Sequence, residues 1–371
     1  MPVTIREVSR RCGLSISSVS KALNNYPDVR EETRAMVHRV ASEIGYFPNA
    51  LARGLKSNRT YNLGVLLDDE LGDNLTHTFF AVVLNQFRRE AEMRGYDITL
   101  INRNMGDKPL SYLNHCKHRQ LDGICLMCVD FSSPEVLELT RGNVISVSID
   151  HPFDGIAGVN SDNRSGMRML IERALSLGHR RIAYVHGTPS YVTHERIASF
   201  RETMSGAGLI VNEDWLVPSH YHSASHAYDA VRRLMSPDGF GGSDGAVESD
   251  GSAESIGFAG TGESAASGVH ENKPTCILMA DDVCALGGMD ALRLLGLRVP
   301  QDVSIAGFDG VEMIQRIHPR VTTIQQDAKL IGARAAALLL DRIENPAAPV
   351  PQAVLAPVTL IEGETVGRVS L

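Results

Sequence analysis

The spacing of apolar residues changes near residue 60, and the two parts of the chain predict different structures. Residues 4–12, 15–24 and 30–44 carry apolar side chains three or four positions apart, which predicts three short helices. Gly13 and Gly45 follow the first and third of these stretches, where helices often end in a glycine. The start of the chain therefore predicts a small, all-helical domain.

Two of these helices begin with residues that favour a helix N-terminus. Thr4 is followed three positions later by Glu7, which is the pattern of a capping box, and Ser15 precedes the second helix. We therefore expect the first two helices to start at these positions.

Beyond residue 60, short apolar runs alternate with longer amphipathic stretches. The runs YNLGVLLDD, LDGICLMCV, NVISVSID and TCILMA are typical of buried strands, and TFFAVVLNQFRREAEMRG is typical of a helix. Such alternation predicts parallel sheets with crossover helices. About 310 residues of this pattern predict two α/β lobes, and ligands in such folds bind beyond the carboxyl ends of the strands.

One segment of the body interrupts the alternation. Residues 237–272 contain seven acidic residues, no lysine or arginine, and many glycines and serines. A segment of this composition has too little apolar surface to order itself. We expect a flexible acidic surface insertion between a helix and the strand TCILMA, and its role stays open.

A short and weak helix is predicted where the two parts meet, in the sequence NALARGL. Leu51 and Leu55 lie four residues apart and form one apolar edge. Gly54 costs about 1 kcal/mol relative to alanine, and helices below roughly 12–15 residues are marginal alone in water. This segment should therefore need a partner in order to fold.

Charge is divided unevenly along the chain. The formal net charge is −8. Residues 1–60 hold ten Lys or Arg against five acids, a net charge of +5, and the remainder carries −13. A basic start on an acidic body favours contact between the start and a polyanion.

Cysteines and histidines show no pattern of a disulfide framework or a metal site. Cys125 and Cys128 form a CxxC within a predicted strand, where residues three apart point to opposite faces. The sequence HCKH at 115–118 offers three potential ligands, but we interpret it as the exposed face of a helix. We expect no metal, no cofactor and no catalytic residues.

The sequence shows neither a membrane-spanning segment nor a signal peptide. The longest apolar runs fall far short of the roughly 18 residues of a membrane span. Met1 is followed by Pro2 and Thr4 rather than by the apolar core of a signal peptide. We expect a cytoplasmic protein without a membrane partner.

The basic helical domain predicts a helix-turn-helix, in which the second helix enters the major groove of DNA. Its exposed side offers Ile16, Ser17, Ser20 and Lys21, whose methyl, hydroxyl and ammonium groups suit base edges and phosphates. The remaining polar residues at the helix ends that we expect to contact DNA are Thr4, Ser15 and Asn24.

The whole stretch TIREVSRRCGLSISSVSKALNNYPDVREETRAMVHRVASEIGYFPNALARGL resembles the N-terminus of the LacI/GalR family of bacterial repressors. The resemblance continues through LGHRRIAYVHG, RIASF, ILMADDVCALGGMDALRLLGLRVPQDVSIAGFDG and VTTIQQD, and it covers nearly the whole chain except 237–272. It implies a helix-turn-helix domain at 1–47, a hinge helix and linker at 48–60, and a two-lobed body at 61–371. The implied fold class is α plus α/β, with a body like the periplasmic sugar-binding proteins.

The resemblance also supplies a partner for the weak helix. In the family this hinge helix orders when two subunits sit on a palindromic operator, and a leucine enters the minor groove. The matching residue is Leu55, with Asn49 and Ala52 on the same segment. Apolar wedges of this kind kink DNA. The resemblance therefore implies a homodimer on double-stranded DNA.

The resemblance further implies a small-molecule site between the lobes of the body. The matching motifs are HTFF, SID, RIASF, ADD, GFDG and IQQD. The implied effector-binding residues are Thr78, Phe79, Asp150, Arg196, His222, Asp281, Asp309 and Gln326. Asp282 is expected to cap the following helix instead, a role that Asp281 could share. Arginine and carboxylates favour the hydroxyls of a sugar as the effector.

Other functions are weighed against this hypothesis of a sugar-controlled repressor of carbohydrate genes. An enzyme is disfavoured because no GxSxG elbow, P-loop or GxGxxG opens a helix. A transport binding protein would have a signal peptide and no basic domain. A nucleobase or a protein corepressor within the same family stays open, as does the direction in which the ligand changes DNA binding.

Overall fold

The computed structural model describes residues 3–47, 59–68, 74–76, 78–105, 108–236, 273–351 and 353–369. The predicted hinge helix and the acidic segment 237–272 lie outside these described residues. The helical part at 3–47 is called the head, and the two α/β parts of the body are called the N-lobe and the C-lobe.

The head consists of α1 (Ile5–Cys12), α2 (Ile16–Leu23) and α3 (Glu31–Glu43). Their inward faces form one small core of buried residues: Val8, Val19, Ala22, Val37 and Ala41. Gly13 ends α1 in the left-handed conformation, with a φ of 64°. The three predicted helices are therefore confirmed, each to within two residues at either end.

The predicted capping box at the first helix is wrong. Ser15 caps α2 as expected, because its Oγ accepts a hydrogen bond from the Ser18 N–H at 3.1 Å. The Thr4 side chain makes no such bond. Glu7 instead binds Arg10 at 2.6 Å along its own helix, since an arginine three residues further on offers a charged partner.

The N-lobe is built on a six-stranded parallel sheet in the order β13-β7-β6-β5-β1-β2. Its strands are β1 (Asn62–Asp68), β2 (Asp97–Leu100), β5 (Gly123–Val129), β6 (Ser146–Ile149), β7 (Ala157–Ser161) and β13 (Val354–Ala356). One face is covered by α5 (Thr78–Met93) and α12 (Ala328–Glu344), and the other by α6 (Tyr112–Arg119) and α7 (Pro134–Arg141). Covering both faces explains why the central strands are buried along nearly their whole length.

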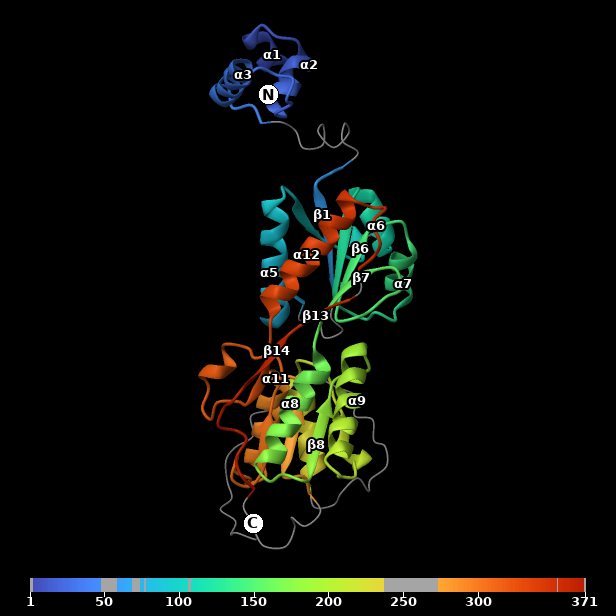
Figure 1. The fold of residues 1–371 in the computed structure, drawn as a ribbon, viewed down its shortest axis with the longest axis vertical. Helices are drawn as coiled ribbons and strands as arrows, with labels where there is room; N and C mark the ends of the chain where they lie inside the picture. Colours follow the sequence, from blue (N-terminus) through green and yellow to red (C-terminus); the bar gives the residue numbers. More distant parts are fainter. Residues whose placement is uncertain are drawn as a thin grey trace.

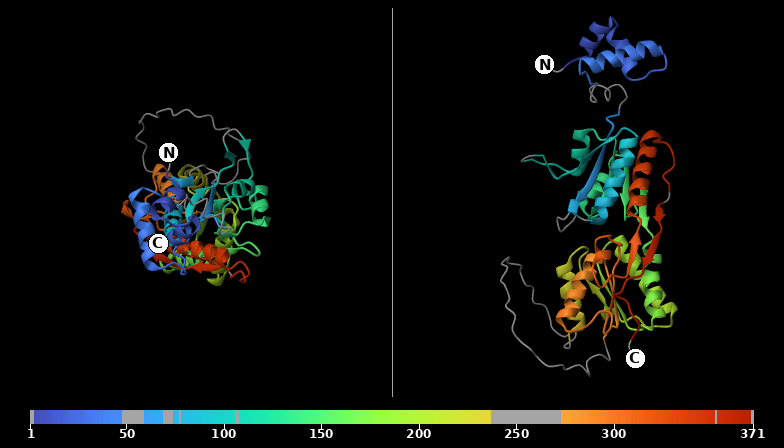
Figure 2. Two further views of the ribbon diagram at one scale, coloured as in Figure 1. Left: turned by 90° about the horizontal axis from the view of Figure 1, so that it is seen from above. Right: turned by 90° about the vertical axis from the view of Figure 1, so that its left-hand side faces the viewer.

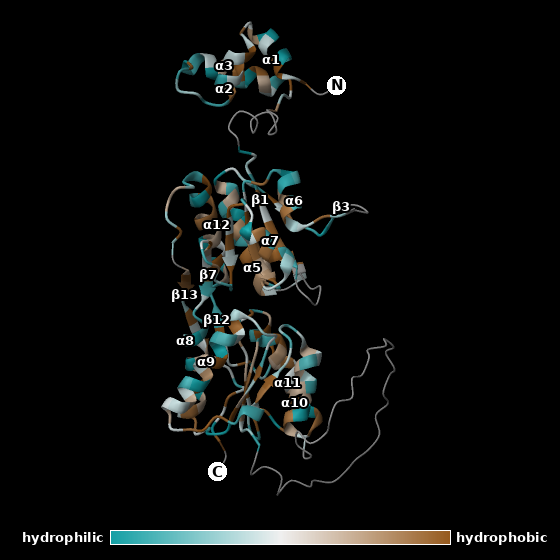
Figure 3. Cartoon of the chain, turned by 90° about the vertical axis from the view of Figure 1, so that its right-hand side faces the viewer, coloured by the Kyte–Doolittle hydropathy of each residue, from teal (hydrophilic) through white to brown (hydrophobic). Residues whose placement is uncertain are grey.

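The C-lobe repeats this architecture with a four-stranded parallel sheet in the order β11-β10-β8-β9. Its strands are β8 (Ile182–His186), β9 (Leu216–Pro218), β10 (Cys276–Met279) and β11 (Ser304–Ala306). On one face lie α10 (Ala224–Met235) and α11 (Asp282–Leu294), and on the other α8 (Asn163–Ser176) and α9 (Tyr191–Gly206). Figure 3 shows the hydrophobic residues concentrated in the sheets and the helix faces turned toward them. The predicted fold class is confirmed.

The chain crosses between the lobes three times. The crossings follow β7, then β12 (Thr323–Gln326), and then β13, after which β14 (Val358–Ile361) pairs antiparallel with β12. The Asp162 N–H donates to the Ala356 carbonyl at 2.9 Å, which ties two crossings together. Figure 2 shows the lobes stacked with these segments between them. The remaining short elements are β3 (Asn104–Met105), β4 (Lys108–Pro109), η1 (Asn74–Thr76), η2 (Glu213–Trp215) and η3 (Ile314–Arg316).

Local chemistry explains where the body helices begin. Side-chain oxygens of serine or aspartate accept a backbone N–H at the start of most of them, and this N-cap satisfies a donor that the helix cannot pair itself. The capping residues are Ser111, Ser133, Asp162, Ser190, Ser223, Asp281 and Asp327.

The HCKH segment is not simply an exposed helix face, which corrects the prediction for two of its residues. His115 is 3% exposed and Cys116 is 1% exposed, both within α6. The His115 ring Nδ1 lies 2.9 Å from the Asn102 carbonyl oxygen. The helix turns these two side chains toward the sheet, whereas Lys117 and His118 face solvent.

All six cysteines are free thiols. Cys125 is fully buried in β5, and burial raises its pKa. Cys128, near the end of the same strand, is partly exposed and packs against the same core as Cys125. The prediction that the two thiols point to opposite faces is therefore wrong, because Cys128 has a φ of 49° and the pairing with β1 shifts register here, which interrupts the alternation of the strand.

Candidate functional site

A cleft lies between the lobes, where the carboxyl ends of both parallel sheets meet. Its volume is about 230 Å³. The loops after β5, β6, β8, β9 and β11 all contribute to its wall, together with the start of α5 and the end of β12. Ligands of open α/β sheets bind at this edge, so we take the cleft as the candidate small-molecule site.

Arg196 is the positive group of the cleft, and its side chain is 3% exposed. It projects from α9, and its Nε donates to Asn163 Oδ1 at 2.8 Å. Its Nη1 donates to the Ala280 carbonyl at 2.7 Å. The guanidinium carbon also lies 3.5 Å from the centre of the Phe308 ring. The charge is therefore fixed in place by α8 and by residues just beyond the ends of β10 and β11.

Two carboxylates oppose this arginine. Asp150 follows β6 with a φ of 65°, and its buried Oδ1 has no hydrogen-bond partner among the described residues. The side chain as a whole is partly exposed to the cleft, but burial of its oxygen raises the pKa to about 6, against the opposing effect of Arg196. Asp309 follows β11 and accepts a bond from Gln326 Nε2 at 2.5 Å. Burial raises its pKa well above the usual value, and the nearby charge of Asp281 raises it further.

Aromatic rings form the apolar part of the wall. Phe79 and Phe80 at the start of α5 meet edge to face, with ring centres 5.1 Å apart. Tyr221 stands across from them on the C-lobe, and its hydroxyl lies 2.8 Å from Thr193 Oγ1. Charged groups beside ring faces suit a ligand with both polar edges and C–H surfaces.

Six of the eight predicted effector residues lie together in this cleft: Phe79, Asp150, Arg196, His222, Asp309 and Gln326. Thr78 lies outside it, exposed beside a neighbouring groove that Phe79 also borders. The α5 helix turns successive side chains by about 100°, so adjacent residues face different ways.

The expectations for Asp281 and Asp282 need correction. Asp281 does not line the cleft but caps α11, accepting the Cys284 N–H at 2.8 Å. Its other oxygen accepts the His222 N–H at 2.7 Å. Asp282 is the first residue of the helix and accepts bonds from Thr323 Oγ1 and the Val311 N–H. The cap is therefore Asp281, which was expected at most to share this role, and Asp282 does not cap the helix.

Several residues of the wall were not predicted from the sequence. Tyr221 is one, and the pair Phe131 and His151 is another, with ring centres 4.7 Å apart and an angle of 12° between ring planes. Burial lowers the pKa of His151. His151 directly follows the predicted Asp150, so its position after a strand was the signal that could have identified it.

The second candidate surface is the outer side of α2 in the head. Ile16 is 45% exposed, Ser17 is exposed, and Ser20 is partly exposed. Lys21 pairs with Asp28, and this hydrogen bond raises the pKa of the lysine. Lys21 must therefore exchange Asp28 for a new partner in order to contact DNA.

The other predicted DNA contacts lie around this surface. The Asn24 amide donates to the Ser20 carbonyl at 2.7 Å, Ser15 is used as the cap of α2, and Thr4 is exposed. The predicted hinge residues Asn49, Ala52 and Leu55 lie outside the described residues.

The described part of the chain contains neither a metal centre nor a membrane span. No cluster of three or more histidine, cysteine or acidic side chains has an arrangement that would hold a metal ion there. Nor does any helix in those ranges have the length and apolar character needed to cross a membrane.

Three family models match the chain. Residues 4–49 match the bacterial regulatory proteins of the lacI family. Residues 60–247 match the periplasmic binding proteins and sugar binding domain of the LacI family, and residues 171–366 match a periplasmic binding protein-like domain. The matches cover the head and both lobes.

Characterised relatives are similar over most of their length. The HTH-type transcriptional repressor PurR of Proteus mirabilis (strain HI4320) is 29% identical over 362 residues, covering 92% of this chain and 91% of the relative. The catabolite control protein A of Priestia megaterium is 29% identical over 345 residues, covering 91% and 92%.

Solved structures share the fold. The lac repressor dimer bound to operator and the anti-inducer ONPF has a TM-score of 0.74 at 22% identity, covering 99% of this chain and 100% of that one. A complex of the transcriptional regulator CelR with cellobiose has a TM-score of 0.66 at 23% identity, covering 98% and 99%.

Proposed function

As a member of the LacI family of bacterial regulatory proteins, this chain is a DNA-binding transcriptional repressor, and we propose that a carbohydrate bound in the cleft controls its affinity for operator DNA. The observation that carries the proposal is the combination of Arg196 with Asp150 and Asp309 beside aromatic rings. The lobes would close on the sugar and alter how the head is presented.

A sugar fits this combination of groups because each hydroxyl both donates and accepts hydrogen bonds. Asp150 offers a buried oxygen without a partner among the described residues, which suits a hydroxyl donor. Arg196 donates and suits a hydroxyl as acceptor. The rings of Phe79 and Tyr221 suit the C–H faces of a pyranose. The CelR complex with cellobiose supports the same class of ligand in a related fold.

A nucleobase is the second candidate, because repressors named PurR are among the similar proteins. The aromatic rings of the cleft would suit the faces of a base as well as the C–H faces of a sugar. The unpartnered Asp150 oxygen and the Arg196 guanidinium favour the hydroxyls of a sugar, and the ligand screen compares the two classes directly.

For the DNA-binding part, we propose that α2 enters the major groove with Ile16, Ser17, Ser20 and Lys21 facing base edges and phosphates. Thr4, Ser15 and Asn24 would contact the DNA near the ends of the helices. Residues 49, 52 and 55 would follow into the minor groove as a hinge helix.

We further propose that the repressor acts as a homodimer on a palindromic operator. One head reads a short half-site, and helix-turn-helix dimers read two half-sites one helical turn apart. The lac repressor structure with operator is itself a dimer. Sedimentation of the purified chain with and without DNA would measure this directly.

A ligand screen tests the proposed effector. The thermal unfolding midpoint of the full chain is measured with a panel of monosaccharides, disaccharides, polyols and nucleobases. A compound that binds only the folded state raises this midpoint. The proposal expects a carbohydrate to give the largest rise and to change the affinity for a DNA duplex selected by the protein from random sequence. A rise with nucleobases alone would replace the sugar by the second candidate.

A further inference from the structure

The end of the N-lobe where β1 begins contains a cluster of contacts that the cleft and the head do not explain. The chain enters the N-lobe there, through Arg59, Thr60 and Tyr61. Arg59 and Thr60 are the last residues of the predicted hinge and linker segment 48–60, and Tyr61 is the first residue of the body. Any influence that the body exerts on the hinge through the polypeptide must pass through them.

Asp122, the residue directly before the neighbouring strand β5, holds this entry point. Its Oδ1 accepts the Thr60 N–H at 2.8 Å and the Thr60 hydroxyl at 3.0 Å. Its Oδ2 accepts the Tyr61 N–H at 2.8 Å. One carboxylate therefore fixes two successive backbone amides, a geometry that a charged acceptor stabilises strongly.

The backbone at this point adopts a conformation that needs such support. Tyr61 has a φ of 57°, in the left-handed region that side chains other than glycine disfavour. Strained residues persist where the surrounding contacts determine them, and they gather at switch regions. The two amides held by Asp122 provide contacts of this kind.

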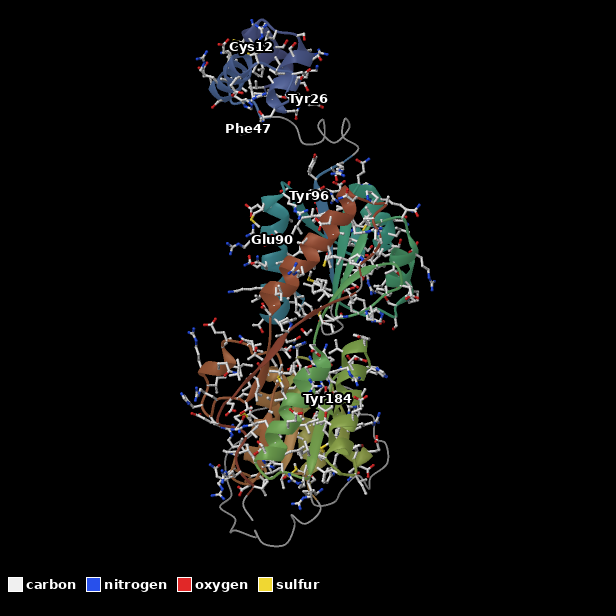
Figure 4. All side chains as sticks on the ribbon, viewed as in Figure 1. Cys12, Tyr26, Phe47, Glu90, Tyr96 and Tyr184 are labelled. Carbon is white, nitrogen blue, oxygen red and sulfur yellow. The ribbon has the colours of Figure 1, made fainter. Side chains whose placement is uncertain are left out.

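A second contact joins the same entry point to α12. Arg59 Nη2 donates to the Ile343 carbonyl at 3.0 Å, in the last turn of that helix. Carbonyls in the last turn have no partner within the helix, so an arginine is a favourable donor there. Close by, Arg94 pairs with Asp341 at 2.8 Å and Glu344 at 3.6 Å. Tyr96 lies in this region, at the end of the lobe where β1 begins (Figure 4).

The opposite end of α12 begins at the cleft. Gln326 lines the cleft and binds Asp309, and the helix starts two residues later, at Ala328. The 17 residues of α12 span about 25 Å, and Figure 1 shows the helix running from the junction of the lobes to the start of β1. Its buried side packs into the N-lobe core as a continuous stripe: Ile331, Ala335, Ala336, Leu339, Leu340 and Ile343.

We propose that Asp122 and Arg59 are positioning residues that couple the cleft to the DNA-binding part, with α12 as the rigid connection between them. A movement of Gln326 when the lobes close shifts one end of α12, and Arg59 transmits the shift to the chain entering the N-lobe. Asp122 keeps that chain on the lobe, so the shift reaches the hinge instead of being lost in a loose linker. This inference rests on the proposed control of DNA binding by the cleft.

Coupling between two sites is reciprocal, so DNA must also affect the cleft. This allows a test that needs no effector. Hydrogen exchange is measured on the full chain, with and without a saturating duplex that the wild type has selected from random sequence. The peptides followed are 307–313 and 326–331, at the cleft end of α12. The variants are Asp122→Ala and Arg59→Met, with Asp154→Ala as the matched control, since Asp154 is an exposed aspartate of the same lobe.

In the wild type and in Asp154→Ala, the duplex should change the exchange rate of these peptides about fivefold or more. A fivefold change is the lower end of the usual range of allosteric coupling. In Asp122→Ala and Arg59→Met the change should fall to less than half, although the duplex is still bound and the thermal unfolding midpoint without DNA shows a folded body. A purely structural role would lower that midpoint and leave the effect of DNA intact.

Either of two results would overturn the proposed coupling: a DNA effect on exchange that is unchanged in both folded variants, or no DNA effect in the wild type. If Asp122→Ala does not fold, the result for Arg59→Met alone tests the coupling. Failure of the wild type to select any duplex would instead contradict the proposed operator binding itself, so the two ideas fail in different ways.

Discussion

Replacing Arg196 by methionine should abolish effector binding at ordinary concentrations while leaving the body folded. Methionine keeps an apolar stem over Phe308 but removes the charge and both donors. Asp150 and Asp309 then lose their opposing charge, and the acceptors on Asn163 and Ala280 lose their donor. The perturbation therefore acts on binding and on stability at once.

The two effects differ in size and can be separated. Truncating one partner of a buried charged group costs about 2–5 kcal/mol of binding, which corresponds to a dissociation constant raised about 30- to 4,000-fold. Each hydrogen bond from a charged donor contributes about 1.5–3 kcal/mol to stability. We thus expect a lower unfolding midpoint in Arg196→Met as well, although the body has two further cores that this residue does not touch.

Isothermal titration with the carbohydrate found in the screen measures the binding, at a temperature where circular dichroism shows the variant folded. Arg168→Met is the matched control, because Arg168 is an exposed arginine on α8 that donates to Ser165 Oγ of its own helix at 3.0 Å. The control should bind like the wild type. An Arg196→Met protein that is folded and binds with wild-type affinity would refute the placement of this charge in the effector site.

Three further predictions concern the head, the pH response and the packing of α12. Lys21→Ala should weaken operator binding by about 1–3 kcal/mol in a fluorescence titration. Asp28→Asn, which removes the ion pair of this lysine, should strengthen operator binding. Operator affinities equal to that of the wild type in both variants would contradict a role for the lysine. Effector affinity should fall as the pH drops through about 6, because the hydroxyl of a sugar donates to the ionised form of Asp150 and protonation removes that form. The Asp150→Asn variant should show a flatter pH profile in the same titration, and an unchanged profile would assign the response to another group. Gly332→Ala should lower the free energy of unfolding by about 1–3 kcal/mol in urea, because its Cβ would lie 2.3 Å from a carbonyl oxygen of α5, while Gly206→Ala, with no atom within 4 Å, should be neutral or slightly stabilising.

The periodicity of the sequence predicted the elements well, because buried strands and amphipathic helices have distinct apolar spacings. The head, both parallel sheets and their crossover helices follow from that spacing. It could not predict how far each strand extends, and this decided which of Asp281 and Asp282 became the cap. The last residue of a strand is set by its hydrogen bonds to the neighbouring strands. The local sequence does not contain this information.

The candidate site was predictable in its residue types but not in its contacts. Arg196 and Asp309 were identifiable as charges near the ends of elements. The partners that hold Arg196 come from positions 33 and 84 residues away, so its fixed orientation is a product of the tertiary fold. Phe131 and His151 carry no motif, and only the meeting of two loops brings their rings together. The hinge residues stay a prediction.

The three crossings between the lobes have a consequence for how the protein is made. The N-lobe begins at residue 62 but cannot close its core until α12 and the edge strand β13 have been synthesised, up to residue 356. All four strands of the C-lobe sheet, from 182 to 306, leave the ribosome earlier. Domains usually fold from the N-terminus as they emerge, but here the second lobe can complete its sheet before the first. During translation the unfinished N-lobe exposes the apolar face that α12 later covers, and this nascent chain is the stage at which we expect chaperones to act.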